Sequence, residues 1–481
     1  MIKRILLFLL LVFMVLAGVL VFNTVQFKSK QLSIEAVPSP AVTASALQHF
    51  KDAIKYQTIS YGDPARLDSM QFFGFHKFLE ATYPLVHSTL THEHVARYSL
   101  LYKWEGTTPD LPPIVMMAHQ DVVPIEEETK TMWSVDPFEG VVKDDFIWGR
   151  GTTDDKINLI SIFEAAEKLL GERYQPERTI YFAFGHDEEM GGTGAQAIAA
   201  VLQSRGVKAD LVIDEGGVIT KEKIPGMKQP VALIGNSEKG YLSLELTVEK
   251  HGGHSSMPEA ETSIDILAKA LVRLREEPFH AEISESTEGF VEHIGPELPF
   301  LQKIVFANQW LFKSIIIGIY EKTAGGNALV RTTMVPTIFK AGVKDNVIPT
   351  VAKVTVNFRL LPGDKGEAVI AQVNEIIHDD RVTVTPTRSF IAEASSVTPE
   401  NSFAYKKVDE TIKKTFSKTI TTPFLMIGGT DSRYFGEVST GIIKFSPMID
   451  PIGFHGIDER VSLESYRSAM WFFEQLMRNT K

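Results

Sequence analysis

The feature of this sequence that most constrains its fold is a set of metal-type side chains spread over most of the chain. They occur in the order His, Asp, Glu, Asp or Glu, His, within MMAHQDVVP, WGRGTTDDK, FGHDEEMGG, LVIDEGG and GFHGIDERV. Each stretch closes a short apolar or glycine-rich run, which is the pattern of strand ends and tight turns that converge on one cleft. The sequence therefore predicts one hydrolytic metal site, with a dinuclear zinc hydrolase as the leading interpretation.

Length and composition limit the alternatives. A chain of 481 residues is too long for one compact core, so we expect at least two domains. The net charge of −11 reflects 60 acidic and 49 basic side chains, which offers no basic surface and predicts no nucleic-acid partner. The absence of cysteine from the sequence excludes disulfides, thiolate zinc sites and a cysteine nucleophile.

The amino terminus indicates a membrane segment. Lys3 and Arg4 precede an apolar run at residues 5–22, which as a helix would be about 27 Å long and nearly span a bilayer core. Because no clear small-x-small cleavage site follows, we expect residues 1–26 to be an uncleaved anchor rather than a removed signal, and residues 27–42 to be a tether. The positive-inside rule then places the catalytic part outside the cytoplasm, in a periplasmic, extracellular or lumenal space, and the protein would be secreted if the segment were cleaved.

Beyond the tether, predicted strands and helices alternate. Helices are expected near residues 44–55 and 68–83, and buried strands in LPPIVMMAHQD, RTIYFAFGHDEE and DLVIDEGG. This alternation predicts an α/β catalytic domain with a mostly parallel central sheet, whose first part covers residues 43–238.

From Gly240 onward the pattern changes. Apolar and polar residues alternate in YLSLELTVEK and VAKVTVNFRL, with helical patterns at residues 263–275 and 367–377. A half-covered sheet with two helices predicts a separate α+β, ferredoxin-like domain at residues 239–394. Because GFHGIDERV follows this segment, the chain must return to the first domain, and residues 395–481 are expected to form its second part.

The first two ligand stretches are weak signals when each is taken alone. His119 and Asp121 are two residues apart at a predicted strand end, so the carboxylate can orient the imidazole. A lone strand-end histidine is nevertheless more often a surface or capped residue. Asp154 and Asp155 follow a GRG turn and precede a helix, and a helix N-cap explains them as well as a metal site does.

Crowded carboxylates at two further strand ends are a clearer signal. Glu188 and Glu189 leave a buried strand together with Asp187, and like charges so close are costly without a cation, although a solvated acidic loop is the alternative. Asp214 and Glu215 end the next strand in the same way. With the histidine of the HxD motif and His455 in its glycine-flanked turn, this set of hard carboxylates and two imidazoles suits zinc or another borderline divalent ion.

On these motifs the chain resembles the dizinc aminoacylase and carboxypeptidase family, metallopeptidase family M-twenty, most closely its carboxypeptidase S-like and N-acyl-amino-acid hydrolase branch. The resemblance covers nearly everything after the tether and implies a zinc-peptidase-type catalytic domain with an inserted lid domain. It also implies two Zn²⁺ ions per subunit, with Co²⁺ or Mn²⁺ as alternatives. The residues that match the family's metal ligands are His119, Asp154, Glu189, Asp214 and His455.

The resemblance assigns further roles near the metal site. Glu188 matches the general base, and Asp121 matches the carboxylate that orients the first histidine. The DE pair leaves a one-residue ambiguity, so Glu215 is kept in reserve for Asp214. The family pattern also implies a cis peptide bond between Asp154 and the following aspartate.

The resemblance suggests substrate-binding residues as well. HGGHSSMP is similar to the family's lid motif, whose second histidine, here His254, reaches a dimer partner's active site; a turn with a helix cap explains it equally well. Arg359 and Asn346 would hold a substrate carboxylate, although a strand arginine is usually only solvated. Gly429 and Thr430, in MIGGTDSRYF, would contribute backbone donors. A homodimer through the lid domain is therefore expected.

An apolar insertion at residues 279–330 includes FLQKIVFANQWLFKSIIIGIY and is expected to form lid helices. Its polar residues, among them Lys303 and Lys313, argue against a second membrane span. Together with the branch that the chain resembles, this surplus of apolar residues motivates the hypothesis that the lid accommodates a long or bulky acyl group.

These features predict a membrane-anchored, zinc-dependent metallopeptidase of carboxypeptidase or aminoacylase type. It would cleave a peptide or N-acyl amide bond adjacent to a free C-terminal carboxylate. One alternative is another dinuclear hydrolase such as a phosphoesterase, which the pattern of carboxylate recognition disfavours. The other is a catalytically silent binding relative, which is disfavoured because every metal and catalytic position of the family pattern is filled.

Overall fold

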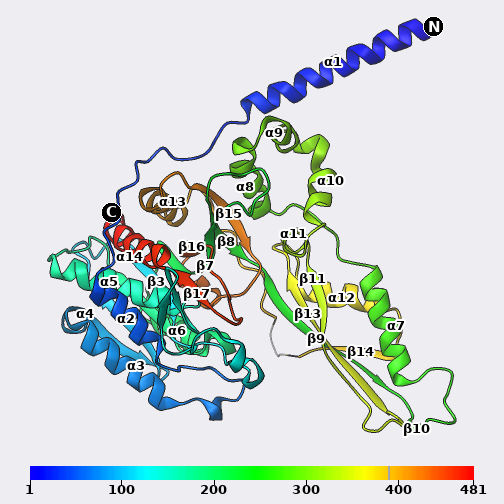
Figure 1. Ribbon diagram of the computed structural model, residues 1–481. Helices are drawn as coiled ribbons and strands as arrows, with labels where there is room; N and C mark the ends of the chain where they lie inside the picture. Colours follow the sequence, from blue (N-terminus) through cyan, green and yellow to red (C-terminus); the bar gives the residue numbers. More distant parts are fainter. Residues whose placement is uncertain (388–390, 481) are drawn as a thin grey trace.

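The centre of the molecule is an eight-stranded sheet (Figure 1), in a computed structural model that describes residues 1–387 and 391–480. The pairs β3–β6, β3–β7, β7–β16 and β8–β15 are parallel. The pairs β1–β2 and β2–β6 at one edge are antiparallel, as are the short pairings of β8 with β16 and β7. This confirms the predicted α/β class with a largely parallel central sheet. In spatial order the strands are β1 (Thr91–Val95), β2 (Ser99–Trp104), β6 (Ile180–Gly185), β3 (Ile114–His119), β7 (Leu211–Thr220), β16 (Ile442–Ile449), β8 (Val231–Glu238) and β15 (Ile420–Met426).

This sheet combines strands from two distant parts of the chain. β16 lies between β7 and β8, and β15 forms the edge next to β8, although both strands follow the second sheet in sequence. The late part of the chain therefore completes the sheet that the early part begins. The boundaries expected at residues 239 and 394 stay a prediction.

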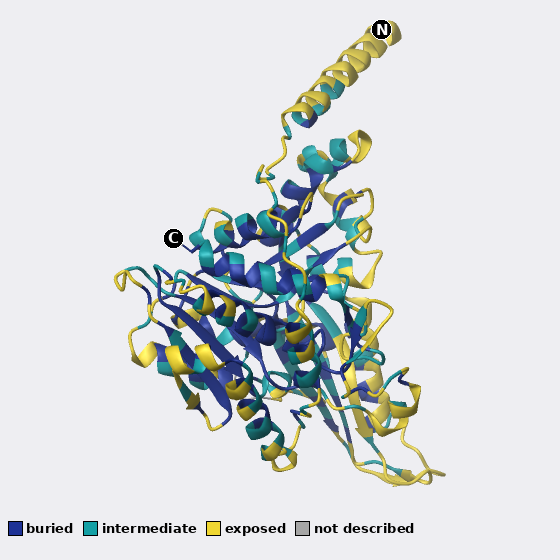
Figure 2. Cartoon of the chain, turned by 60° about the vertical axis from the view of Figure 1, so that its left-hand side comes forward, coloured by how far each residue is buried: buried dark blue, intermediate teal, exposed yellow. Residues whose placement is uncertain are grey.

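Helices cover both faces of the central sheet, so its strands are buried (Figure 2). On one face, Phe50 stacks on Tyr466 with ring centroids 4.6 Å apart, and the Tyr466 hydroxyl donates to the carbonyl of Ala46 at 2.9 Å. The helices packed on this face are α2 (Ala44–Ile54), α3 (Ser69–Thr82), α4 (Pro84–Thr89), α5 (Lys156–Gly171), α13 (Phe403–Thr415) and α14 (Leu463–Arg478). The opposite face carries α6 (Thr193–Ser204) and the short helix η5 (Asp431–Glu437).

A second sheet lies apart from the first and is antiparallel throughout. Its strand order is β11 (Thr333–Ala341), β13 (Val351–Leu360), β9 (Gly240–Glu249) and β14 (Val382–Pro386). Burial alternates strictly along β9 and β13, because only one face is covered, by α7 (Ser263–Glu276) and α12 (Gly366–Ile377). A two-stranded ribbon, β10 (Gly253–His254) with β12 (Val347–Ile348), extends from the far end of this sheet (Figure 1).

The apolar insertion forms four helices: α8 (Glu285–Ile294), α9 (Phe300–Ala307), α10 (Gln309–Tyr320) and α11 (Ala324–Val330). α8 does not cover the second sheet. It packs beside β15 at the edge of the central sheet, where Ile294 and Leu298 join Val231 and Ile420 in a small apolar cluster. Part of the segment expected as lid helices is therefore built onto the central sheet.

Most of the first helix, α1 (Ile2–Gln26), projects away from the rest of the molecule (Figures 1 and 2), and only its carboxyl-terminal end packs against α9. It is long and apolar enough to cross a membrane, with a mean hydropathy of 3.3 over a window in which no residue is buried. The segment expected as a tether, residues 27–42, contacts the central sheet. The Gln31 side chain donates to the carbonyl of Thr421 at 2.9 Å and accepts from the backbone N–H of Thr421 at 2.8 Å, which attaches this segment to β15.

A small third sheet sets the position of two loops. β17 (Arg460–Ser462) pairs with β5 (Phe146–Trp148), which also pairs with β4 (Val141–Lys143). The loop after β5 therefore lies beside the loop before β17. The remaining short helices are η1 (Pro64–Arg66), η2 (Glu127–Met132), η3 (Glu188–Met190) and η4 (Gly295–Glu297).

Candidate metal centre

The candidate ligands converge because their segments meet at the carboxyl edge of the central sheet. His119 is the last residue of β3, β6 ends at Gly185 just before η3, and β7 carries Asp214 and Glu215. β7 continues to Thr220, but its parallel pairing with β3 ends at Ile213, so Asp214 and Glu215 follow directly at the edge where β3 ends. The third sheet adds the two remaining loops, one on either side of the β5–β17 pair.

Asp154 lies between the two histidines. Its Oδ1 is 2.9 Å from Nε2 of His119, and its Oδ2 is 2.7 Å from Nε2 of His455. His455 Nε2 also lies 3.1 Å from Oε1 of Glu189. One carboxylate therefore faces two imidazoles through its two oxygens, an arrangement that suits a ligand shared by two cations.

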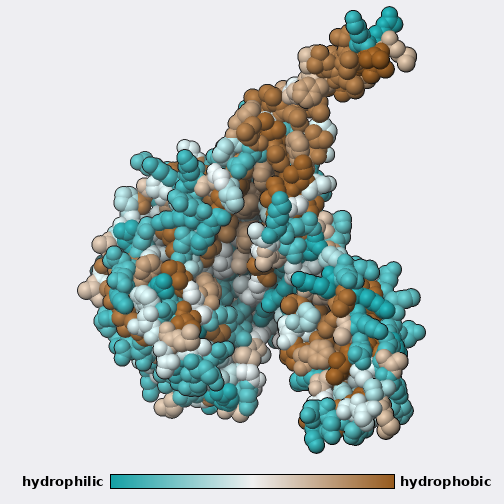
Figure 3. Space-filling model, turned by 45° about the vertical axis from the view of Figure 1, so that its right-hand side comes forward, coloured by the Kyte–Doolittle hydropathy of each residue, from teal (hydrophilic) through white to brown (hydrophobic). Residues whose placement is uncertain are grey.

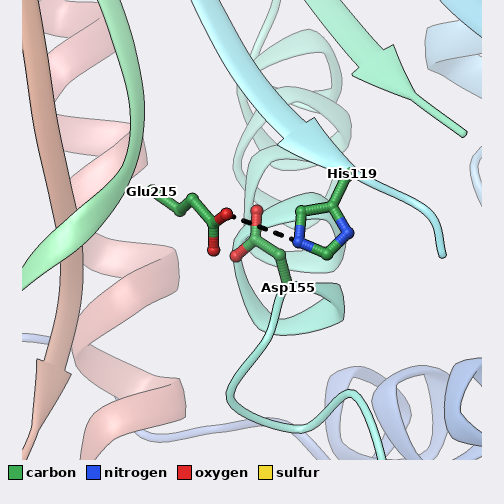
Figure 4. Close-up of side chains that lie close together, drawn as sticks. All are labelled: His119, Asp155 and Glu215. Atoms are coloured by element: carbon green, nitrogen blue, oxygen red, sulfur yellow. Dashed lines mark ion pairs between the residues drawn. The ribbon is translucent and has the colours of Figure 1, made fainter. Parts of the chain in front are cut away.

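Two further carboxylates, those of Asp155 and Glu215, also lie near His119. One ligand atom each from His119, Asp155 and Glu215 lies within 4.8 Å of the others, as do atoms of His119, Asp154 and Glu189. Figure 4 shows Glu215 and Asp155 directed towards the imidazole, with Glu215 Oε1 3.5 Å from His119 Nε2. The peptide bond between Asp154 and Asp155 is cis, which confirms that prediction.

Glu215, and not Asp214, makes the contact with His119. The carboxylate of Asp214 accepts the backbone N–H of Glu215 at 3.0 Å and that of Ser432 at 2.7 Å. Successive side chains of a strand point to opposite faces, so only one member of the DE pair can face the centre. The geometry favours Glu215, the reserve candidate from the sequence.

Asp121 fixes the orientation of the His119 ring. Its Nδ1 lies 3.0 Å from the carbonyl oxygen of Asp121, which can only accept, so Nδ1 carries the proton and Nε2 faces the centre. The Asp121 carboxylate accepts the backbone N–H groups of Glu188 at 3.1 Å and Glu189 at 3.2 Å. This buried aspartate therefore positions both the histidine and the acidic pair.

The donor set fits a metal ion. Buried Asp155 has a carboxylate oxygen, Oδ2, with no hydrogen-bond partner among the described residues. Burial is the main cause that raises the pKa of Asp155 and Glu215 far above the usual range. Contacts with Asp154 and Glu189 raise the pKa of His455 to about 10, so without a bound cation this ring would be protonated at neutral pH. The centre attracts positive charge, which a divalent cation supplies.

Glu188 lies beside the centre and belongs to neither group of candidate ligands. Burial, with the nearby charges of Glu189 and Asp121, raises its pKa to about 8. A carboxyl group with a pKa near neutrality can both take and return a proton.

A buried salt bridge joins the two ligand loops. Glu459 accepts Arg150 Nη1 at 2.6 Å, the Gly151 N–H at 3.0 Å and the Thr153 N–H at 2.8 Å. Arg150 also donates to the carbonyl of His455 at 3.3 Å. In the sequence, the only signal for this pair is a charged residue within each of the two glycine-containing motifs.

Asp431 is a second residue that the sequence analysis missed. It is buried, and neither carboxylate oxygen has a hydrogen-bond partner among the described residues. A Cβ atom on Gly185 would lie 2.5 Å from this carboxylate, so the glycine at the end of β6 makes room for it. Burial and the nearby charge of Glu188 raise the pKa of Asp431 far above the usual range.

Three of the predicted substrate-binding residues lie near one another. Thr430 Oγ1 is 3.3 Å from Oε2 of Glu238, and Gly429 lies close to the same carboxylate. Arg359, at the end of β13, has its guanidinium 4.8 Å from the ring centroid of Tyr241, and its charge interacts with that of Glu238. The Thr430 hydroxyl also contacts the Ser432 hydroxyl at 2.7 Å, and the Ser432 N–H donates to Asp214. These three residues therefore border the metal centre.

His254 and Asn346 lie elsewhere. Both belong to the β10–β12 ribbon region, where the Ser255 N–H donates to the carbonyl of Asn346 at 3.2 Å. His254 is exposed, and its Nδ1 contacts the Ser256 hydroxyl at 2.8 Å. Among the described residues, no hydrogen bond or ion pair connects either side chain to the histidines of the centre, and Figure 1 places the ribbon at the far end of the second sheet.

An α/β sheet that, together with two adjoining loops, gathers two histidines and several carboxylates is the arrangement expected of a metal-dependent hydrolase. The protein-family sequence model described as "Peptidase family M20/M25/M40" matches residues 115–479, and the chain belongs to this family. This confirms the resemblance noted in the sequence. The protein is a metallopeptidase or amidohydrolase, and the relatives do not favour a phosphoesterase or a silent binding relative.

Individual relatives agree with this placement. "Probable carboxypeptidase S-like 2" of Dictyostelium discoideum is 37% identical over 478 residues, covering 96% of this chain and 91% of that protein. "N-fatty-acyl-amino acid synthase/hydrolase PM20D1" of Homo sapiens is 41% identical over 438 residues, covering 89% and 86%. The solved metallo-carboxypeptidase Sso-CP2 from Sulfolobus solfataricus has the same fold, with a TM-score of 0.67, 18% identity, and coverage of 91% and 99%.

Proposed function

We propose that the protein is a membrane-anchored dizinc amidohydrolase that cleaves an N-acyl amino acid or a peptide at the amide next to a free carboxylate. The observation that carries this proposal is the position of Asp154, which contacts His119 at 2.9 Å and His455 at 2.7 Å through opposite oxygens. Two imidazoles that share one carboxylate, each with a further carboxylate beside it, support a pair of divalent ions rather than one.

The ligands divide into two groups. His119 and Glu215 would hold one ion and Glu189 and His455 the other, with Asp154 between them. Glu215 is preferred to Asp214 because its carboxylate approaches the histidine, at 3.5 Å. When bound, two such ions polarise an amide carbonyl and make a nearby water molecule more acidic.

Glu188 would move the proton. Its carboxylate takes a proton from the attacking water and delivers it to the departing amide nitrogen, so the amine leaves in neutral form. Its pKa of about 8 supports this role, because both protonation states are then accessible near neutral pH. Asp121 accepts the N–H of Glu188 at 3.1 Å, which holds the backbone of the base in place.

Residues 239–394 would form the lid that recognises the substrate carboxylate. The guanidinium of Arg359 is the candidate partner, with Gly429 and Thr430 on the facing loop. His254 and Asn346 lie on an exposed ribbon far from this centre (Figure 1), which supports a role in the site of a second subunit and hence a homodimer through the lid.

The acyl group is proposed to be long or bulky. This follows from the apolar insertion and from the similarity to a human N-fatty-acyl-amino acid synthase/hydrolase. Comparing N-acetyl and N-long-chain-acyl forms of one amino acid tests it, and a strong preference for the acetyl substrate would exclude a fatty-acyl substrate while leaving the hydrolase itself intact.

The reaction is tested with a substrate panel on zinc-reconstituted protein beside Glu188→Gln. We expect this variant to lose turnover while its bound metal stays at the wild-type level, because Glu188 is no ligand. Glu375→Gln, on the exposed face of α12, removes the same charge far from the site and should leave turnover unchanged. Wild-type turnover in Glu188→Gln, or loss of its metal, would contradict the role of Glu188.

A further inference from the structure

The α9–α10 hairpin, residues 300–320, exposes an unusual number of large apolar side chains. Phe300 and Leu301 on α9 are 55% and 78% exposed, and Trp310 on α10 is 62% exposed. Ile315 and Ile319 continue the exposed face along α10. Figure 3 shows the hydrophobic surface of this region running on towards α1. A contiguous apolar surface of this kind marks a site of interaction.

The hairpin is joined to the end of α1. Asn308, the buried residue between α9 and α10, accepts the Asn23 side-chain amide at 2.9 Å and donates to the carbonyl of Leu20 at 3.2 Å. α1 and α9 also pack against each other. The residues that α1 uses for this contact belong to its last two turns. If α1 crosses a bilayer, these turns lie where the chain leaves the lipid, so the hairpin lies at the level of the membrane surface.

The length and charge of the hairpin suit a helix pair that lies on a membrane rather than through it. α10 has 12 residues, about 18 Å of helix, too short for the roughly 30 Å hydrocarbon core. Residues 300–320 include no Asp or Glu but carry Lys303 and Lys313, so the charged groups are cationic. Apolar faces with lysines are typical of helices that lie in the headgroup region, where anionic lipids attract the cations.

We propose that the α9–α10 hairpin is a second, peripheral membrane contact, which inserts its apolar face into the bilayer surface beside α1. This inference rests on the proposed membrane span of α1 and does not depend on the hydrolase reaction. Two contacts restrict the orientation of the body, as a single flexible tether would not. The bonds between Gln31 and Thr421 support the same rigid arrangement, because they attach the chain after α1 to the central sheet.

The test uses the full chain in lipid nanodiscs of phosphatidylcholine and phosphatidylglycerol. Because the sequence contains no cysteine, single cysteines at Leu301 and Ile315 can carry spin labels without other changes. A cysteine at Phe8, within α1, serves as the reference for lipid. Met257 and Val343, exposed by 78% and 95% near the β10–β12 ribbon, are matched apolar positions that should remain in water.

For each label, the ratio of its collision rate with oxygen to its collision rate with a water-soluble nickel chelate is measured. We expect this ratio to be several-fold higher for the hairpin labels than for labels at Met257 and Val343. Hairpin labels that match these two controls would overturn the proposal. Labels shielded from both reagents, with spin–spin broadening that disappears on dilution with unlabelled protein, would show that a second copy covers the face, and would also overturn it.

Trp310 gives an independent measurement in the unlabelled protein. Trp104, Trp133 and Trp148 are buried and Trp471, in α14, is partly buried, so Trp310, which is 62% exposed on the hairpin, should account for most of the quenching by brominated lipid. We expect this quenching to disappear in Trp310→Phe. Equal quenching in the wild type and the variant would count against insertion of the hairpin.

Discussion

The salt bridge between Arg150 and Glu459 leads to the sharpest prediction, because it joins the loop of Asp154 to the loop of His455. Both side chains are almost fully buried, with 4% and 1% of their surfaces exposed, and their closest atoms are 2.6 Å apart. Glu459→Gln keeps the shape of the side chain but removes its charge. The guanidinium then remains buried without its counter-ion, which typically costs about 3–5 kcal/mol of unfolding free energy.

The same substitution should weaken metal binding without removing a ligand. Arg150 donates to the carbonyl of His455 at 3.3 Å, so a displaced guanidinium shifts the loop that carries this histidine. Loss of a residue that supports a ligand typically lowers metal affinity about 10–100-fold. We therefore expect Glu459→Gln to have a lower unfolding midpoint, a lower zinc affinity in competition with a chelator, and faster hydrogen exchange at residues 149–156 and 453–460.

A surface ion pair serves as the control. Glu172→Gln removes the same charge from a partly exposed contact with Lys168 at 2.7 Å, where the expected cost is about 0–1 kcal/mol. If Glu459→Gln were as stable as Glu172→Gln and bound zinc as tightly as the wild type, the assignment of Arg150 and Glu459 as the link between the ligand loops would be wrong.

Three further predictions concern single side chains. Glu215→Gln should lose bound metal, whereas Asp214→Asn should keep it, as measured by metal analysis after gel filtration; the reverse result would favour Asp214 as the ligand. Arg359→Lys should raise KM for a free-acid substrate about 10-fold, the equivalent of about 1.4 kcal/mol, but leave KM for the corresponding C-terminal amide unchanged. Burial lowers the pKa of His76 from 6.5 to about 4, so the folded state holds this ring neutral. As the pH falls, His76 takes up a proton in the unfolded chain before it does so in the folded protein. About 3 kcal/mol of unfolding free energy is therefore lost as the pH falls from 6.5 to about 4. In His76→Asn, the unfolding midpoints measured at pH 6.5 and pH 4 should differ less than in the wild type. An equal difference would contradict the lowered pKa of His76 in the folded protein.

The local pattern of the sequence predicted much of the fold. Helices expected at residues 44–55 and 263–275 occur as α2 (Ala44–Ile54) and α7 (Ser263–Glu276). The caps explain this agreement, because the Thr43 hydroxyl accepts the Ala46 N–H and Thr262 forms a capping box with Asp265. Such signals lie within a few residues of the element that they begin.

The placement of the apolar insertion could not be predicted in this way. Its periodicity indicates helices but does not say which surface they cover. α8 packs at the edge of the central sheet, and α9 contacts α1, because long-range packing and the Asn23–Asn308 bond decide the position. The sequence pattern of the segment was equally compatible with a lid over the second sheet.

For this protein, the sequence by itself determined the family, the α/β class, and the short motifs that carry the candidate ligands, since each depends on residue types within a few positions of one another. Only the tertiary structure decided that Glu215 rather than Asp214 approaches His119, and that Glu459 and Arg150 hold the two ligand loops together. These choices depend on strand register and on contacts between segments far apart in the chain. No local pattern of residues encodes such contacts, because they form only when the late strands β15 and β16 join the sheet that the early strands begin.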